Sequence, residues 1–132
     1  MASIFTKIVN GEIPSYSIAE DDRFFAFLDI NPVSKGHCLV IPKQETDYLF
    51  DLDPALLGDL IKFAQKIAKA LKQAIDCKRV GVAVMGLEVP HAHIHLVPMN
   101  SEADIDFRKP KIKLTPDEFK ALTQKIKQYV TL

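Results

Sequence analysis

The sequence lacks the features that usually place a chain in a membrane or outside the cell. Its 132 residues contain no segment approaching the ~18 uninterrupted apolar residues of a membrane span. Residues 1–11 have neither the continuous apolar region nor the small-residue cleavage site of a signal peptide. Two cysteines, Cys38 and Cys77, are too few for a disulfide framework. We therefore expect a cytoplasmic protein with reduced thiols.

The chain also lacks net charge, repeats and linkers. Seventeen Lys and Arg residues balance seventeen Asp and Glu residues, so no overall field attracts nucleic acid or an anionic membrane, and neither is an expected partner. Any anionic ligand must be held by local groups. No Gly/Ser linker or low-complexity tract divides the sequence, and neither a P-loop nor a dinucleotide fingerprint occurs. The length and the 48% hydrophobic content predict one domain over residues 1–132.

The hydrophobic pattern predicts an α+β fold. Apolar residues at helical spacing indicate a short helix over 3–10, a long helix from Asp53 to Ile75 and a closing helix that begins with a capping box at Thr115 and Glu118. Strands are expected over 16–19, 24–29, 37–41, 79–85 and 91–98. These elements describe a five-stranded, largely antiparallel sheet with one long crossover helix and a helix at each end. A parallel doubly wound sheet would need a regular strand and helix alternation that the sequence does not have.

Three of the four histidines are His91, His93 and His95, which form the sequence His-Ala-His-Ile-His. On a strand these imidazoles share one face at intervals of roughly 7 Å, while the intervening apolar residues face the core. Three interpretations are open. Alternate histidines bind metal ions, although three ligands on one short strand would require unusual curvature. In the second interpretation, the histidines are polar groups whose hydrogen bonds are satisfied within the fold. In the third, they form a catalytic set in which one histidine is a nucleophile or base.

The segment from Val89 to Val97, Val-Pro-His-Ala-His-Ile-His-Leu-Val, resembles the signature of the histidine triad (HIT) superfamily of nucleotide hydrolases and transferases. Further segments resemble its HINT-like branch in the same order along the chain: Ile4-Phe5, Lys7-Ile8-Val9, Gly11-Glu12-Ile13-Pro14, Phe27-Leu28-Asp29-Ile30 and Gly36 to Lys43. The resemblance covers residues 3–98. Residues 99–132 are a C-terminal extension that contains the closing helix.

The resemblance implies a homodimer with joined sheets that cleaves a bond to the α-phosphate of a purine nucleotide conjugate through a nucleotidyl-histidine, without a cofactor. His93 would be the nucleophile, His95 and His37 would flank the phosphate, and His91 would support this network. Asp29 would accept hydrogen bonds from the ribose hydroxyls. The base pocket would consist of Ile4, Phe5, Ile8, Phe27 and Ile30. A nucleotide-binding or sensing module with weak or lost catalysis is the alternative, and a metalloenzyme is a third hypothesis.

The sequence departs from the family pattern at two places. Ser3 and Thr6 stand where many bacterial members have a zinc-binding Cys-x-x-Cys, and Glu45 stands where a further histidine often follows, so no structural zinc is expected. The usual polar residues before the triad are replaced by Gly-Leu-Glu-Val at 86–89. Glu88 of this loop would repel a phosphate unless its carboxylate turns away, holds a proton, or acts as acid or base towards the leaving group.

A basic stretch lies beyond the resemblance, in the C-terminal extension. It contains Arg108, Lys109, Lys111 and Lys113. These side chains could approach the phosphates of a substrate or a dimer partner, but a solvated loop is the interpretation that we favour.

Overall fold

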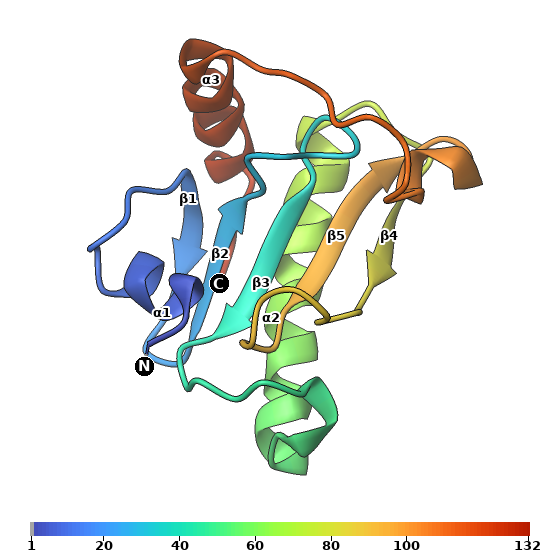
Figure 1. The fold of residues 1–132 in the computed structure, drawn as a ribbon. Coiled ribbons are helices and arrows are strands. Elements are labelled where there is room, and N and C mark those ends of the chain that lie inside the picture. The colour runs from blue at the N-terminus through green and yellow to red at the C-terminus, as the bar shows by residue number, and fades with distance from the viewer. Residues whose placement is uncertain (1) are drawn as a thin grey trace.

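A five-stranded antiparallel sheet in the order β1-β2-β3-β5-β4 organises the chain (Figure 1). The computed structural model describes residues 2–132. The strands are β1 (Ser17–Glu20), β2 (Phe24–Leu28), β3 (Cys38–Pro42), β4 (Arg79–Ala83) and β5 (Ile94–Met99). The helices are α1 (Ile4–Val9), α2 (Pro54–Ala74) and α3 (Pro116–Lys127), with 3-10 turns η1 (Leu49–Asp51) and η2 (Glu102–Ile105). The predicted α+β class is confirmed.

The two faces of the sheet are covered by different parts of the chain (Figure 1). Helix α2 packs on one face, whereas α1 and the loop of residues 84–93 lie on the other. Successive side chains of a strand point to opposite faces. Phe24, Ala26 and Leu28 of β2 therefore belong to the α2 side, and Phe25 and Phe27 belong to a second cluster with Phe5 of α1. All five residues of β2 are buried as a result.

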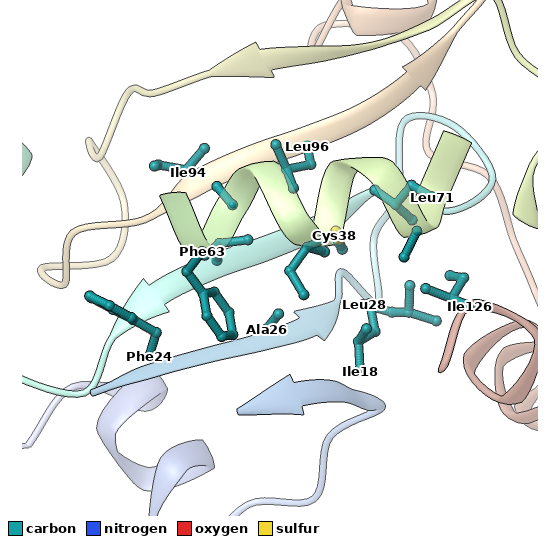
Figure 2. Packing of buried hydrophobic residues seen from close by; sticks show 14 of the residues in the cluster. Ile18, Phe24, Ala26, Leu28, Cys38, Phe63, Leu71, Ile94, Leu96 and Ile126 are labelled. Carbon is teal, nitrogen blue, oxygen red and sulfur yellow. The ribbon is translucent and has the colours of Figure 1, made fainter. Parts of the chain in front are cut away.

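The main core lies between the sheet and α2 (Figure 2). The long helix begins at the Asp53 cap, whose carboxylate accepts a hydrogen bond from the Ala55 N–H at 3.1 Å. Its apolar stripe meets the strands, and α3 covers one end of the same core. The stripe contains Leu60, Phe63, Ala64, Ile67 and Leu71, and α3 contributes Phe119, Leu122 and Ile126. No helix within residues 2–132 is both long and apolar enough to cross a membrane.

Two predicted strand boundaries are wrong, because residues 84–93 form a loop between β4 and β5. β5 begins at Ile94, where it pairs with Val40, and not at His91; β4 ends at Ala83 and not at Met85. The preceding main chain bonds elsewhere, because the His91 N–H donates to the Val89 carbonyl at 2.8 Å and the Ala92 N–H donates to the Thr46 carbonyl at 2.6 Å. His91 and His93 therefore lie on the approach to β5, and His95 alone of the triad lies in the strand. Ala92, Ile94 and Leu96 still face the α2 core, as expected.

The backbone conformation at position 36, just before His37, requires a glycine. Its φ is +92°, and a Cβ would lie 3.1 Å from both Ile75 Cγ1 and Pro98 Cγ. We expect Gly36→Ala to lower the free energy of unfolding by about 1–2 kcal/mol, measured by urea denaturation. Gly58→Ala is the matched control. Gly58 lies in α2 with open space around it, so alanine there should raise the free energy of unfolding by up to about 1 kcal/mol. Equal responses of the two variants would contradict this account.

Candidate active site

A pocket of about 480 Å³ opens on the face of the sheet opposite α2. It is assembled from α1, the end of β2 and the turn after it, β3, the 84–93 loop, β5 and the C-terminal segment. Its lining is largely apolar, with a few polar groups, which is the usual composition of a small-molecule site. The polar and charged members include Asp29, His37, Glu88, His93, His95 and Lys111.

His93 has a defined tautomer. Its Nδ1 lies 2.7 Å from the main-chain oxygen of His91, and because a carbonyl can only accept, Nδ1 must carry a proton. When the ring is neutral, this leaves the lone pair on Nε2. The ring is 7% exposed and packs against the edge of Phe5, with the centroids 5.1 Å apart. His93 therefore offers the pocket a fixed, nucleophilic nitrogen.

His91 is fully buried and does not line the pocket. Its Nε2 donates to the Pro42 carbonyl at 2.7 Å, so its Nδ1 accepts the Ser3 hydroxyl at 2.8 Å. Burial lowers the pKa of His91, although the hydrogen bond to Pro42 and the charge of Glu45 oppose that effect. With both ring nitrogens engaged, His91 fixes the position of its own carbonyl, which accepts the hydrogen bond from His93 Nδ1.

Ser3 belongs to a polar cluster that ties α1 to the chain after β3. The Ser3 hydroxyl caps α1 by accepting the Thr6 N–H at 3.0 Å. Glu45 accepts the Ser3 N–H and the Thr6 hydroxyl, the latter at 2.7 Å. These hydrogen bonds, that from Ser3 first, lower the pKa of Glu45 to about 2. The carboxylate thus stays ionised and holds α1 against the end of β3.

His37 and His95 form a second chain with defined proton positions. The Val33 N–H donates to His37 Nδ1 at 3.1 Å, so the neutral ring carries its proton on Nε2 and donates it to His95 Nδ1 at 3.0 Å. His95 must then carry its own proton on Nε2. Burial lowers the pKa of His37 to about 3, helped by the repulsion that a protonated His37 would meet from a protonated His95 and from Lys111, and burial lowers the pKa of His95 to about 4. Both rings are neutral near pH 7, and His95 has an N–H left for a ligand.

Asp29 lies beside this pair, with its Oδ2 3.6 Å from His37 Nε2. Burial raises the pKa of Asp29, which is opposed by the Asn31 N–H that donates to Oδ1 at 2.8 Å. The ligand atoms of Asp29, His37 and His95 lie within 4.8 Å of one another, a spacing that could suit a metal ion. A metal would need the lone pair of His37 Nε2, however, and moving the proton to Nδ1 would set it against the Val33 N–H. The hydrogen bonds therefore disfavour metal binding at this cluster.

The structure brings together all but one of the site residues predicted from the sequence. His37, His93 and His95 line the pocket with Asp29 and Glu88, as do Ile4, Phe5, Ile8, Phe27 and Ile30, whereas His91 lies behind it. Glu88 is exposed in the 84–93 loop, where it contributes to the lining.

Sequence reasoning missed two pocket residues of the C-terminal extension, Phe107 and Lys111. The ring of Phe107 lies over the histidine pair, with its centroid 4.8 Å from that of His95 and 5.5 Å from that of His37. The basic stretch is the one sequence signal for Lys111, and a solvated loop accounts for that signal equally well. No sequence signal marked Phe107.

Comparisons with known proteins show the family of the chain. Residues 10–102 match the family model described as the HIT domain. An adenosine 5'-monophosphoramidase of Schizosaccharomyces pombe is 35% identical over 128 residues, covering 96% of each chain. The crystal structure of a Hit-like protein involved in cell-cycle regulation from Bartonella henselae superposes with a TM-score of 0.83 at 34% identity, over 97% of this chain and 96% of that one. A Zn-bound histidine triad family protein from Mycobacterium smegmatis gives 0.82 at 30% identity, over 98% and 93%.

The Ser3 cluster does not suit a structural zinc ion. It offers two hydroxyls, one carboxylate and the Nδ1 of His91, whereas structural zinc prefers cysteine thiolates and histidines. The four groups already satisfy one another by hydrogen bonds that lock α1 to His91. Hydrogen bonds among these polar groups therefore hold α1 to His91 without thiolates or a metal ion.

The buried, neutral His37 predicts a dependence of stability on pH. The unfolded chain takes up a proton on this histidine below about pH 6.5, while the folded chain does so only near pH 3. The stabilisation is therefore complete above pH 6.5 and is lost as the pH falls towards 3. We expect the free energy of unfolding, measured by urea denaturation at pH 7, 6 and 5, to fall with a steeper slope in the wild type than in His37→Gln. The slopes should differ by at most about 1.4 kcal/mol per pH unit.

Gln44→Ala is the control. Gln44 is exposed and does not titrate, so this variant should keep the wild-type slope. Parallel curves for the wild type and His37→Gln would show that folding does not lower the pKa of His37.

Proposed function

The chain belongs to the HIT family, and from this premise we propose that it is a nucleotidyl hydrolase that cleaves phosphoramidate-type conjugates of purine nucleoside 5'-monophosphates. The observation that carries the proposal is the tautomer of His93, since a protonated Nδ1 held by the His91 carbonyl directs a lone pair from Nε2. The phosphoramidase name of the Schizosaccharomyces pombe relative supports this class of substrate.

In the proposed first step, His93 Nε2 attacks the α-phosphorus and the P–N bond to the leaving amine breaks. The amine departs with a proton taken from solvent. The imidazole that forms the new P–N bond becomes positively charged, and its Nδ1–H remains bonded to the His91 carbonyl, which stabilises that charge. His95 donates its Nε2–H to a phosphoryl oxygen, where negative charge develops.

In the proposed second step, water attacks the phosphorus of the nucleotidyl-histidine, the bond between phosphorus and His93 Nε2 breaks, and the water gives one proton to solvent. The nucleoside monophosphate is released, and the imidazole of His93 returns to its neutral form with Nδ1 protonated. The remaining pocket residues would hold the nucleoside. Asp29 would accept hydrogen bonds from the ribose hydroxyls, and the purine would lie among Ile4, Phe5, Ile8, Phe27 and Ile30.

Substitution of the nucleophile tests this proposal. His93→Ala should lower hydrolysis of adenosine 5'-phosphoramidate by at least about a thousandfold, because no nucleotidyl-enzyme can form. Mass spectrometry of the acid-quenched wild type should detect an adenylyl adduct on a peptide that contains His93, and the adduct should be absent from the variant.

Near-wild-type single-turnover activity in a folded His93→Ala protein would remove His93 from this role. Binding of AMP by the wild type without turnover of phosphoramidates or dinucleoside polyphosphates would instead favour a nucleotide-binding module. The 86–89 loop is the feature that supports this alternative, because Glu88 places a carboxyl group at the pocket where family members have other polar residues.

We also propose that the protein forms a homodimer through β4. This strand is an edge of the sheet, and within residues 2–132 no strand pairs with its outer side. Apolar side chains are exposed on and just after it: Val82 is 61% exposed and Leu87 is 93% exposed, with Val84 and Met85 between them. A second copy pairing along β4 would extend the sheet and cover these residues.

Sedimentation velocity tests the dimer. Val82→Glu should shift the protein to the monomer, because a carboxylate at a strand pairing buries an uncompensated charge. Phe50→Glu, at an equally exposed apolar residue of η1, should leave the oligomeric state unchanged. A monomeric wild type, or a dimer unaffected by Val82→Glu, would exclude the β4 interface.

A further inference from the structure

The C-terminal extension closes one side of the pocket. After η2 the chain turns back over the sheet, and the Ile112 N–H donates to the Pro32 carbonyl at 2.8 Å, which fixes the segment beside the turn that follows Asp29 (Figure 1). Phe107 covers the imidazoles of His37 and His95 from this side. This segment lies beyond residues 10–102, which match the family model.

The four cations of the basic stretch, Arg108, Lys109, Lys111 and Lys113, have different surroundings. Arg108 makes a two-pronged contact with Asp106 at 3.0 and 3.1 Å, and the ammonium of Lys109 lies 3.8 Å from a carboxylate oxygen of Asp104. Lys111 instead donates to the main-chain oxygen of Phe107 at 2.7 Å. Of the lysines and arginines in the described chain, Lys111 is the one that lines the pocket.

Lys111 supplies the pocket with a positive charge and with N–H donors for a phosphate. His37 and His95 are neutral near pH 7, and the carboxyl groups of Asp29 and Glu88 also line the cavity. Lys111 is therefore the one lysine or arginine, within the described chain, whose positive charge lies at the pocket to meet a phosphate. An ammonium has three N–H donors, and the bond to Phe107 uses one of them. Two remain for phosphoryl oxygens, which lysine commonly binds as a point charge.

We propose that Lys111 is a phosphate-recognition residue of this pocket, which binds the phosphoryl oxygens of a nucleotide next to the His37–His95 pair and makes the site select nucleotides over uncharged nucleosides. The proposal rests on the proposed function, since it takes the ligand to be a nucleoside 5'-phosphate. It adds a residue outside the triad and outside the family match. The main-chain carbonyl of Phe107 accepts a hydrogen bond from the Lys111 ammonium, and the Phe107 side chain packs over His37 and His95.

Calorimetric binding of AMP and of adenosine to the full chain tests this assignment. Lys111→Met should weaken AMP binding about tenfold, because a charge-assisted hydrogen bond is lost, and should change adenosine binding less than twofold. Lys111→Arg keeps the charge and should restore most of the AMP affinity. Lys113→Met, which removes an exposed cation outside the pocket, should leave both affinities unchanged.

The outcomes separate this inference from the proposed function. Wild-type affinity for AMP in Lys111→Met, or equal loss of AMP and adenosine binding, would overturn the role of Lys111 while leaving the nucleotide pocket in place. If the wild type binds neither AMP nor adenosine, the proposed function fails, and the phosphate-recognition role fails with it. Equal losses in Lys111→Met and Lys113→Met would indicate a general effect of net charge and would also overturn the assignment.

Discussion

The hydrogen bond from His93 Nδ1 to the His91 carbonyl is the interaction on which the site depends. A neutral imidazole has one proton, so the nitrogen that faces a carbonyl must carry it and the other must keep the lone pair. This selection works only if the carbonyl is immobile. His91 is held through both ring nitrogens, by Pro42 at the end of β3 and by Ser3 at the cap of α1. The stability of α1 and the chemistry of His93 are therefore linked through one buried side chain.

The second hydrogen-bonded chain, from Val33 through His37 to His95, applies the same principle to a donor. Each acceptor nitrogen forces the proton onto the far side of its ring, and the last N–H is presented to the ligand. Burial keeps these rings uncharged, so the pair contributes a neutral N–H donor to the pocket, and Lys111 is the one lysine or arginine of the described chain in its lining.

The sheet makes this arrangement possible because both of its faces are used. Along β3, Cys38 and Val40 pack towards α2, and Leu39 and Ile41 face the side of the pocket. A slip of one residue in the pairing of β3 with β5 would move His95 into the apolar core and Ile94 into the pocket. Packing of α2 on the apolar set thus specifies which side chains reach the site.

The sequence by itself determined the elements whose causes are local. The Asp53 cap, the capping box at Thr115 and the apolar stripe of α2 all involve neighbours within a few turns, and each is present in the structure. The alternation around His91, His93 and His95 also predicted which side chains enter the core. The resemblance to a known family supplied the apolar residues that line the pocket, which local patterns could not distinguish from ordinary core.

Only the tertiary structure decided the features that join distant residues. The start of β5 at Ile94 depends on main-chain pairing with β3, and His91 meets Ser3 across 88 positions of sequence. Lys111 was one of four similar cations until the fold placed Asp106 and Asp104 beside two of them and the pocket beside it. The physical reason is common to these cases: hydrogen bonds and charges act at a few ångströms in space, and spacing along a chain does not report which distant groups folding brings within that range.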